Sequence, residues 1–283
     1  MQELTSAMRG RSELPPEMGQ RVPVLADGAG YLLQLLSDDD IAFDVLVAEI
    51  ERFPPIVARL LALANSAWSA PVAPVTSLVT ACSRLGLKAV RSAALALAVA
   101  DPFDPTVCPA FDPRRYWSSA LLTAEAAGLL AEGAVQTDAQ SARAAGLLRN
   151  IGLLWLADSM PGPTGRALER AAEEPGAVLE VLLRESCGLD QLEAGRILAA
   201  YWDLPSVFVD AAYLDRSVVA TARAGLPLAV LGGAALASVV RAEGDGEIAV
   251  ALPGVPAEET AAVQGAVARE RQRLEELAEQ LCA

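Results

Sequence analysis

The spacing of apolar residues constrains the fold of this chain more than any other feature. Apolar side chains return at steps of three and four residues through most of the sequence, which is the period of a helix with one buried face. Alternation typical of a strand is confined to the short stretch 247–252. The sequence therefore predicts an all-α, multi-helical fold, with helices at about 25–36, 41–51, 55–64, 75–85, 87–100, 113–131, 138–158, 165–173, 177–185, 191–201, 206–214, 227–241 and 257–281.

The predicted helices fall into two groups, separated by a stretch of proline and acidic residues between Asp101 and Pro113. We expect an N-terminal tail over 1–21 and a helical domain over 22–240, divided into packed subdomains at about 22–104 and 105–240. A C-terminal helical extension over 241–283 completes the chain. Its apolar stripe contains under three clean heptads, which favours packing onto the domain over a separate coiled coil. A homodimer formed through this extension stays open.

Charge and composition exclude several classes of protein. The formal net charge is −14 at pH 7, whereas extended contact with a phosphate backbone requires a cationic surface, so we expect no nucleic-acid partner. The 4 cysteines are scattered without a CxxC pair, as in reduced packing positions of a cytoplasmic protein. The first 20 residues lack the apolar core of a signal peptide, and the apolar window 225–240 is too short to span a bilayer. We expect a cytoplasmic location without membrane insertion.

The chain contains no histidine. Histidine is the commonest protein ligand for transition metals and the usual proton carrier near neutral pH, so its absence excludes Ser-His-Asp and Cys-His triads and histidine-bearing metal sites. A Mg²⁺ or Ca²⁺ site made only of carboxylates stays open, because these ions accept all-oxygen shells. The only acidic run, Asp38–Asp40, lacks the glycine and spaced ligands of an EF-hand and is interpreted as a solvated helix start. We expect no cofactor.

Several short motifs follow one another in a characteristic order. They are the leucine-rich segment 55–67 ending in Asn65-Ser66-Ala67, then Arg84-Leu85-Gly86, Arg115-Tyr116-Trp117, Gly146–Gly152 and Trp202–Pro205. Together they resemble the HDOD domain, the HD-related output domain of bacterial signalling proteins, over roughly residues 22–240. The resemblance implies an all-α fold and a regulatory role in bacterial signal transduction, often beside receiver or cyclic-dinucleotide domains. No such domain is recognised in this sequence, so we expect a signalling partner in trans.

The same resemblance locates a degenerate site. Gly146–Gly152 has the form of the helix that carries the metal-binding His-Asp pair in HD phosphohydrolases, and Arg149 and Asn150 stand at the place of that pair. Arginine is always protonated and has no lone pair for a metal. The resemblance implies that the remaining positions of the ancestral site are Ser119, Gln191, Asp215 and Arg216.

The missing ligands predict a noncatalytic pseudoenzyme that acts through protein–protein interaction. One alternative is a degenerate pocket that binds a nucleotide or another small anion through Arg149, and a second is residual phosphohydrolase activity. A buried guanidinium must be paired, so Arg149 is expected either to form an ion pair with Asp215 or Glu185 or to bind such an anion.

Two further features are candidates for contact with an anion or a partner. Arg84, Lys88 and Arg91 are spaced by four and three residues, which predicts a cationic face on one helix side. Trp68 lies in a proline-containing loop, where aromatic side chains serve as interface anchors. Ordinary alternatives are a solvated charged face for the first and a seal between the subdomains for Trp68.

Overall fold

The computed structural model describes residues 22–25, 27–36, 40–65, 74–174, 176–204, 209, 212–213, 225–242 and 250–282. Within these ranges all regular structure is helical and no strand occurs, which confirms the all-α prediction. The predicted helix 206–214 and the first part of the stretch 247–252 lie mainly outside the described residues, as does the expected tail 1–21; the described residues 250–252 are not in a strand.

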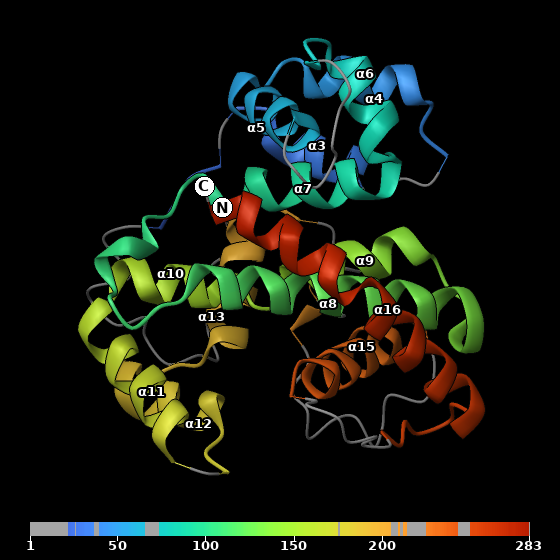
Figure 1. Ribbon diagram of the computed structural model, residues 1–283. Helices are drawn as coiled ribbons and strands as arrows, with labels where there is room; N and C mark the ends of the chain where they lie inside the picture. The colour runs from blue at the N-terminus through green and yellow to red at the C-terminus, as the bar shows by residue number, and fades with distance from the viewer. Residues whose placement is uncertain are drawn as a thin grey trace.

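An N-terminal group of helices forms the upper part of the molecule in Figure 1. It consists of α3 (Ala29–Leu36), α4 (Phe43–Ile50), α5 (Pro54–Asn65), α6 (Leu78–Leu85) and α7 (Leu87–Ala100). Each short helix buries an apolar face, including Leu32, Leu46 and Leu60, which are all fully buried. Gly86 lies between α6 and α7 with φ 82°, a conformation that glycine adopts without steric cost, so the chain can turn directly from one helix into the next.

The side-chain amide of Asn65, at the end of α5, bonds to backbone groups on both sides of the following connection. Its Nδ2 donates to the carbonyls of Leu61 and Val75, both at 2.8 Å, and its Oδ1 accepts from the backbone N–H of Val75 at 2.8 Å. The amide therefore ties the end of α5 to the chain just before α6.

The helix α8 (Pro113–Leu130) is the central element of the remaining structure (Figure 1). It begins with Asp112, whose carboxylate accepts from the backbone N–H of Arg115, and with Pro113 in its first turn. Most of its side chains are buried because α9 (Ala139–Leu148), α15 (Gly225–Ala242) and α16 (Ala257–Cys282) all pack against it. The short segments η1 (Pro105–Val107) and the π-helical η2 (Ala131–Val135) precede and follow α8.

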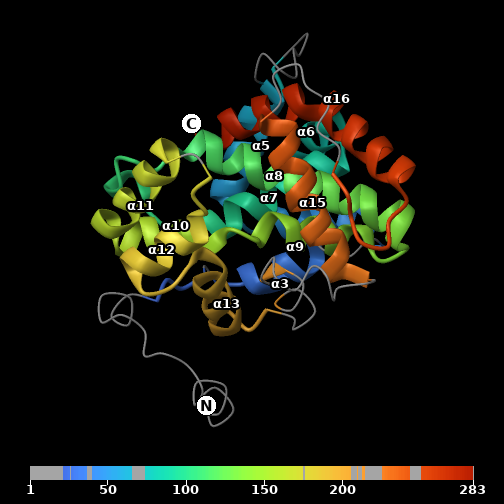
Figure 2. The ribbon, with the colours of Figure 1, turned by 90° about the horizontal axis from the view of Figure 1, so that it is seen from below.

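The helices between α9 and α15 form a second group. It contains α10 (Ile151–Ser159), α11 (Pro161–Glu173), α12 (Leu179–Cys187) and α13 (Gln191–Tyr201), with α10 against α13 and α11 against α12. Figure 2 shows this group on the side of the molecule away from α15 and α16.

The C-terminal helix α16 joins the N-terminal group to the rest of the molecule. It packs mainly along α8 and also reaches α5, α7 and α15. Its apolar stripe is turned inward, with Val267, Leu277 and Leu281 buried. In the part of the chain that the structure describes, no helix has both the length and the apolar character needed to cross a bilayer.

Candidate functional site

The HD-like segment lies at a break between two helices. The sequence predicts one continuous helix over 138–158, and this prediction is wrong, because α9 ends at Leu148 and α10 begins at Ile151. Two residues lie between them; Arg149 keeps helical angles, whereas Asn150 has φ −105° and ψ 14°, in the bridge region. The break leaves backbone groups without the hydrogen-bond partners that a continuous helix would have given them.

Arg149 is buried at this break, with 3% of its surface exposed. Its Nη1 donates to the backbone carbonyl of Ala212 at 2.7 Å, and the hydroxyl of Tyr213 donates to the carbonyl of Leu148 at 3.1 Å. Two hydrogen bonds thus hold residues 212–213 against the end of α9. Burial raises the pKa of Tyr213, and the positive charge of Arg149 opposes that rise.

Only one of the two carboxylates expected to pair with Arg149 lies in the described part of the chain. Glu185 is exposed on α12, and its carboxylate accepts from Nη1 of Arg170 at 3.1 Å. Asp215 and Arg216 lie outside the described residues, as does Trp68.

Close contact between α10 and α13 brings Gln191 to the same junction. A Cβ added to Gly152 would lie 2.1 Å from the carbonyl oxygen of Gln191 and 2.3 Å from the backbone nitrogen of Gly195, so only glycine fits there. The ring of Tyr213 covers Gly195 in turn. The structure therefore gathers Arg149, Asn150 and Gln191 around one helix crossing.

Ser119 lies on α8 and is half-buried; its carbonyl accepts from Thr123 Oγ1 at 2.7 Å. The residue of α8 that faces Tyr213 is Tyr116, one turn earlier, whose pKa is raised by burial and by the proximity of Tyr213. Sequence reasoning did not identify Tyr116 or Tyr213 as part of this junction. The glycines at 152 and 195 were the available signal, because small residues mark places where helices approach closely.

Two polar atoms at the junction are buried without a hydrogen-bond partner among the described residues. They are the hydroxyl oxygen of Tyr116 and Oε1 of Gln191. Buried polar groups are normally satisfied by protein or by ordered water. Within the described ranges, no group of three or more His, Cys, Asp or Glu side chains is arranged to hold a metal ion.

The three basic residues of the expected cationic face have different surroundings. Arg84 is exposed on α6, and Lys88 is partly exposed at the start of α7. Arg91 is only 4% exposed, so the expectation of a single solvated face is wrong at this position. The reason is that α7 is apolar nearly all round and packs against α3, α5, α6 and α9.

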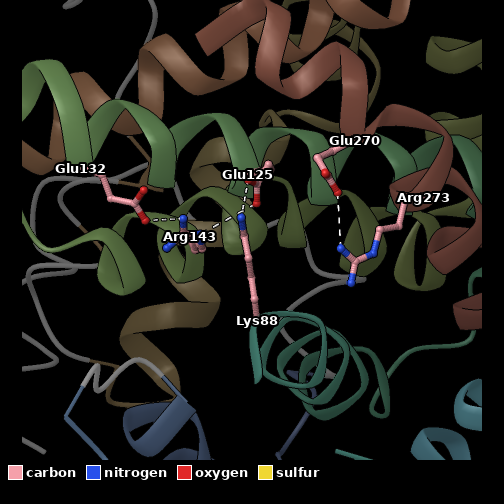
Figure 3. Close-up of polar contacts among 6 residues, drawn as sticks. All are labelled: Lys88, Glu125, Glu132, Arg143, Glu270 and Arg273. Carbon is pink, nitrogen blue, oxygen red and sulfur yellow. Dashed lines mark hydrogen bonds and ion pairs between the residues drawn. The ribbon is translucent and has the colours of Figure 1, made fainter. Parts of the chain in front are cut away.

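Lys88, the only lysine, takes part in an ion-pair network that joins three helices (Figure 3). Its Nζ contacts the carboxylate of Glu125 on α8, and the other oxygen of Glu125 lies 3.9 Å from Nε of Arg143 on α9. Nη2 of Arg143 contacts Oε1 of Glu132 at 2.6 Å. Glu125 and Arg143 are buried, so the network satisfies charges that would be costly alone.

The Lys88 network borders a cavity of about 360 Å³ between the start of α7, the middle of α8 and α16. Arg269, Glu270 and Arg273 of α16 line its opposite side, and Nη1 of Arg273 lies 3.5 Å from Oε2 of Glu270 (Figure 3). Cations and carboxylates are mixed around this cavity. Its geometry therefore supports a contact between the helix groups more than an anion site.

Comparison with known families and structures decides the classification. The model of the HDOD domain matches residues 22–217 of this sequence. The chain belongs to the HDOD family. That assignment agrees with the order of the motifs in the sequence.

Solved structures share the HDOD fold at low sequence identity. A candidate phosphohydrolase from Shewanella amazonensis SB2B is 22% identical, with a TM-score of 0.70 over 94% of this chain and 98% of that protein. An HDOD domain protein of unknown function from Geobacter sulfurreducens is 19% identical, with a TM-score of 0.68 over 98% and 96% of the two chains.

A candidate signal transduction protein from Marinobacter aquaeolei VT8 is 22% identical and has a TM-score of 0.78. The match covers 100% of this chain but 65% of the Marinobacter protein. No curated protein matches the sequence significantly.

Proposed function

We propose that this HDOD chain is a noncatalytic, cytoplasmic signal-transduction module of a bacterium, which regulates a signalling protein in trans through protein–protein contact. Membership of the HDOD family supports the signalling role, as does the similarity to a Marinobacter protein named for signal transduction. The observation that supports the absence of catalysis is the buried hydrogen bond of Arg149 to the Ala212 carbonyl.

The HDOD resemblance implies that Arg149 takes the place of the metal-binding pair of an HD enzyme, and its buried hydrogen bond supports a structural role for it there. Its guanidinium cannot ligate a metal, and Nη1 is already committed to the carbonyl of Ala212 at 2.7 Å. The chain has no histidine, and the other side chains that the described residues bring to this junction are the amides of Asn150 and Gln191 and the hydroxyl groups of Tyr116 and Tyr213. These groups lack a pKa near neutrality and do not supply a general base.

The residues of the HD-like segment argue against both alternative functions. A nucleotide held through Arg149 would have to share a buried guanidinium whose Nη1 already donates to the Ala212 carbonyl. Hydrolysis of the kind named for the Shewanella protein would need metal ligands that the HD-like segment of this chain does not carry.

The proposal is tested by complementation in the source bacterium. The gene is deleted, and the transcriptome is compared after return of the wild-type chain, Asn150→Ala or Ser119→Ala. Both substituted side chains are only half-buried, so both variants should fold. We expect both variants to restore the transcript levels as well as the wild type, because no chemistry depends on these positions.

Gly152→Leu serves as a control that should fail, because its side chain would collide with the backbone of α13. An Asn150→Ala protein that melts like the wild type but does not restore transcript levels would contradict the proposal, since it would show that the degenerate site itself is needed.

A further inference from the structure

A second cavity, of about 500 Å³, lies between the start of α8, the end of α15 and α16. Its lining includes Asp112, Arg114, Arg115 and Ser118 at the start of α8, Arg241 on α15 and Glu275 on α16. These three helices pack directly on one another, and Figure 2 shows α15 and α16 side by side over α8. None of the lining residues belongs to the degenerate HD positions or to the Lys88 network.

We call this second cavity the arginine cavity. Most charges around it already have partners within the protein. Arg114 forms an ion pair with Glu279, and Nε of the neighbouring Arg271 lies 2.8 Å from Oε1 of Glu275. The carboxylate of Asp112 accepts from the backbone N–H of Arg115 at 3.0 Å as the cap of α8, which reduces its capacity to neutralise a cation.

The guanidinium groups of Arg115 and Arg241 differ from these. Neither forms a hydrogen bond or an ion pair with its side chain in the described part of the chain. Arg241 is half-buried, and its pKa is lowered by burial and by the positive charges of Arg115 and Arg271. Like charges that approach one another repel, and an anion between them would relieve that repulsion.

This local excess of positive charge contrasts with the whole chain, which has a net charge of −14. Solvent-exposed charges further than about 8 Å away are largely screened at physiological ionic strength, so the nearby arginines dominate the potential in the cavity. Guanidinium groups match phosphate oxygens with two parallel hydrogen bonds. The hydroxyl of Ser118, on the same wall, is a further donor.

We propose that the arginine cavity binds a small phosphorylated molecule through its phosphate group, with Arg115 and Arg241 as the principal contacts and Ser118 as an additional donor. The volume of about 500 Å³ lies within the range of small-molecule sites and is large enough for a nucleotide. The inference does not depend on whether the chain is catalytic, because the cavity shares no lining residue with the degenerate site.

Isothermal titration of the full chain tests the proposal, with pyrophosphate and ADP as separate probes at constant ionic strength. We expect saturable binding of at least one probe. Arg115→Gln and Arg241→Gln should each weaken that binding about tenfold or more, because each removes a hydrogen bond between charged groups. Arg166→Gln, which removes an exposed arginine of α11, changes the net charge equally and should leave the Kd unchanged.

The two probes distinguish the sources of the phosphate. A lower Kd for ADP than for pyrophosphate indicates a nucleotide, whereas equal or weaker binding of ADP indicates recognition of phosphate alone; both results support the site. Without probe, Arg241→Gln should have a Tm equal to or above that of the wild type, because no protein partner is lost.

Three results would overturn the proposal. The first is the absence of saturable binding for both probes. The second is an unchanged Kd in Arg115→Gln, an exposed position where misfolding is not an explanation. The third is an equal loss of affinity in Arg166→Gln, which would assign binding to net charge.

Discussion

Replacement of Gly152 by alanine tests the packing on which the candidate site depends. The added Cβ would lie 2.1 Å from the carbonyl oxygen of Gln191, whereas ordinary van der Waals contact begins at 3.4 Å. The backbones of α10 and α13 would have to separate by about 1.3 Å, the difference between these two distances. Trp155, which is fully buried on α10, would lose part of its packing in the process.

Overpacking usually costs about 1 to 3 kcal/mol, and the upper end applies when the colliding atoms belong to backbone. We therefore expect Gly152→Ala to lower the free energy of unfolding by about 3 kcal/mol, a decrease in Tm of roughly 6 to 12 °C. Urea denaturation followed by circular dichroism measures the first quantity, and calorimetry measures the second.

Gly265→Ala is the matched control. Gly265 lies inside α16, and its added Cβ would meet only the flexible end of Arg269 at 3.5 Å. This substitution should stabilise the protein by about 0.5 to 1 kcal/mol, because alanine loses less conformational entropy in a helix. A Gly152→Ala protein within about 0.5 kcal/mol of the wild type would refute the close approach of α10 and α13.

Three further predictions concern buried polar groups. Arg149→Ala should lower the free energy of unfolding by about 3 kcal/mol in urea denaturation, because it removes the charged donor to the 212–213 segment; an unchanged value would show that this contact is not stabilising. Burial raises the pKa of Tyr116 and Tyr213 and raises that of Cys82 to about 11, so the unfolded chain loses these protons at a lower pH than the folded chain. The free energy of unfolding should therefore fall as the pH rises from about 8 through 11, and Tyr116→Phe should make that fall shallower. In thiol titration of the native protein with an aromatic disulfide, the exposed Cys282 should react first and the three buried cysteines only after denaturation; two rapidly reacting thiols would contradict the assigned burial.

Periodicity located the helices well but could not reveal the break at the HD-like segment. Apolar residues at 147, 148, 151, 154 and 155 keep steps of three and four across it, so the pattern of one long helix continues through two. The break depends on the backbone of Asn150 and on contacts with residues 212–213, which are far away in sequence. Such contacts leave no local signal.

The motif order identified the family, because a set of short motifs in sequence is far more specific than each alone. The partners of individual charges were less accessible to sequence reasoning. Arg149 donates to a backbone carbonyl, and every residue has one, so no pairing of charged residue types could indicate Ala212. Arg91 is buried because α7 has apolar neighbours on several sides, which a spacing of basic residues does not show.

Metal-dependent turnover by the purified chain tests our proposal that the HD-type site has lost its chemistry. Elemental analysis should find no stoichiometric transition metal. Incubation with nucleoside monophosphates or cyclic dinucleotides in the presence of Mg²⁺, Mn²⁺ or Fe²⁺ should release no more product than the same reaction with Arg149→Ala. One metal ion per chain that survives chelation, together with turnover that is lost in Asn150→Ala, would show that the site has kept its chemistry.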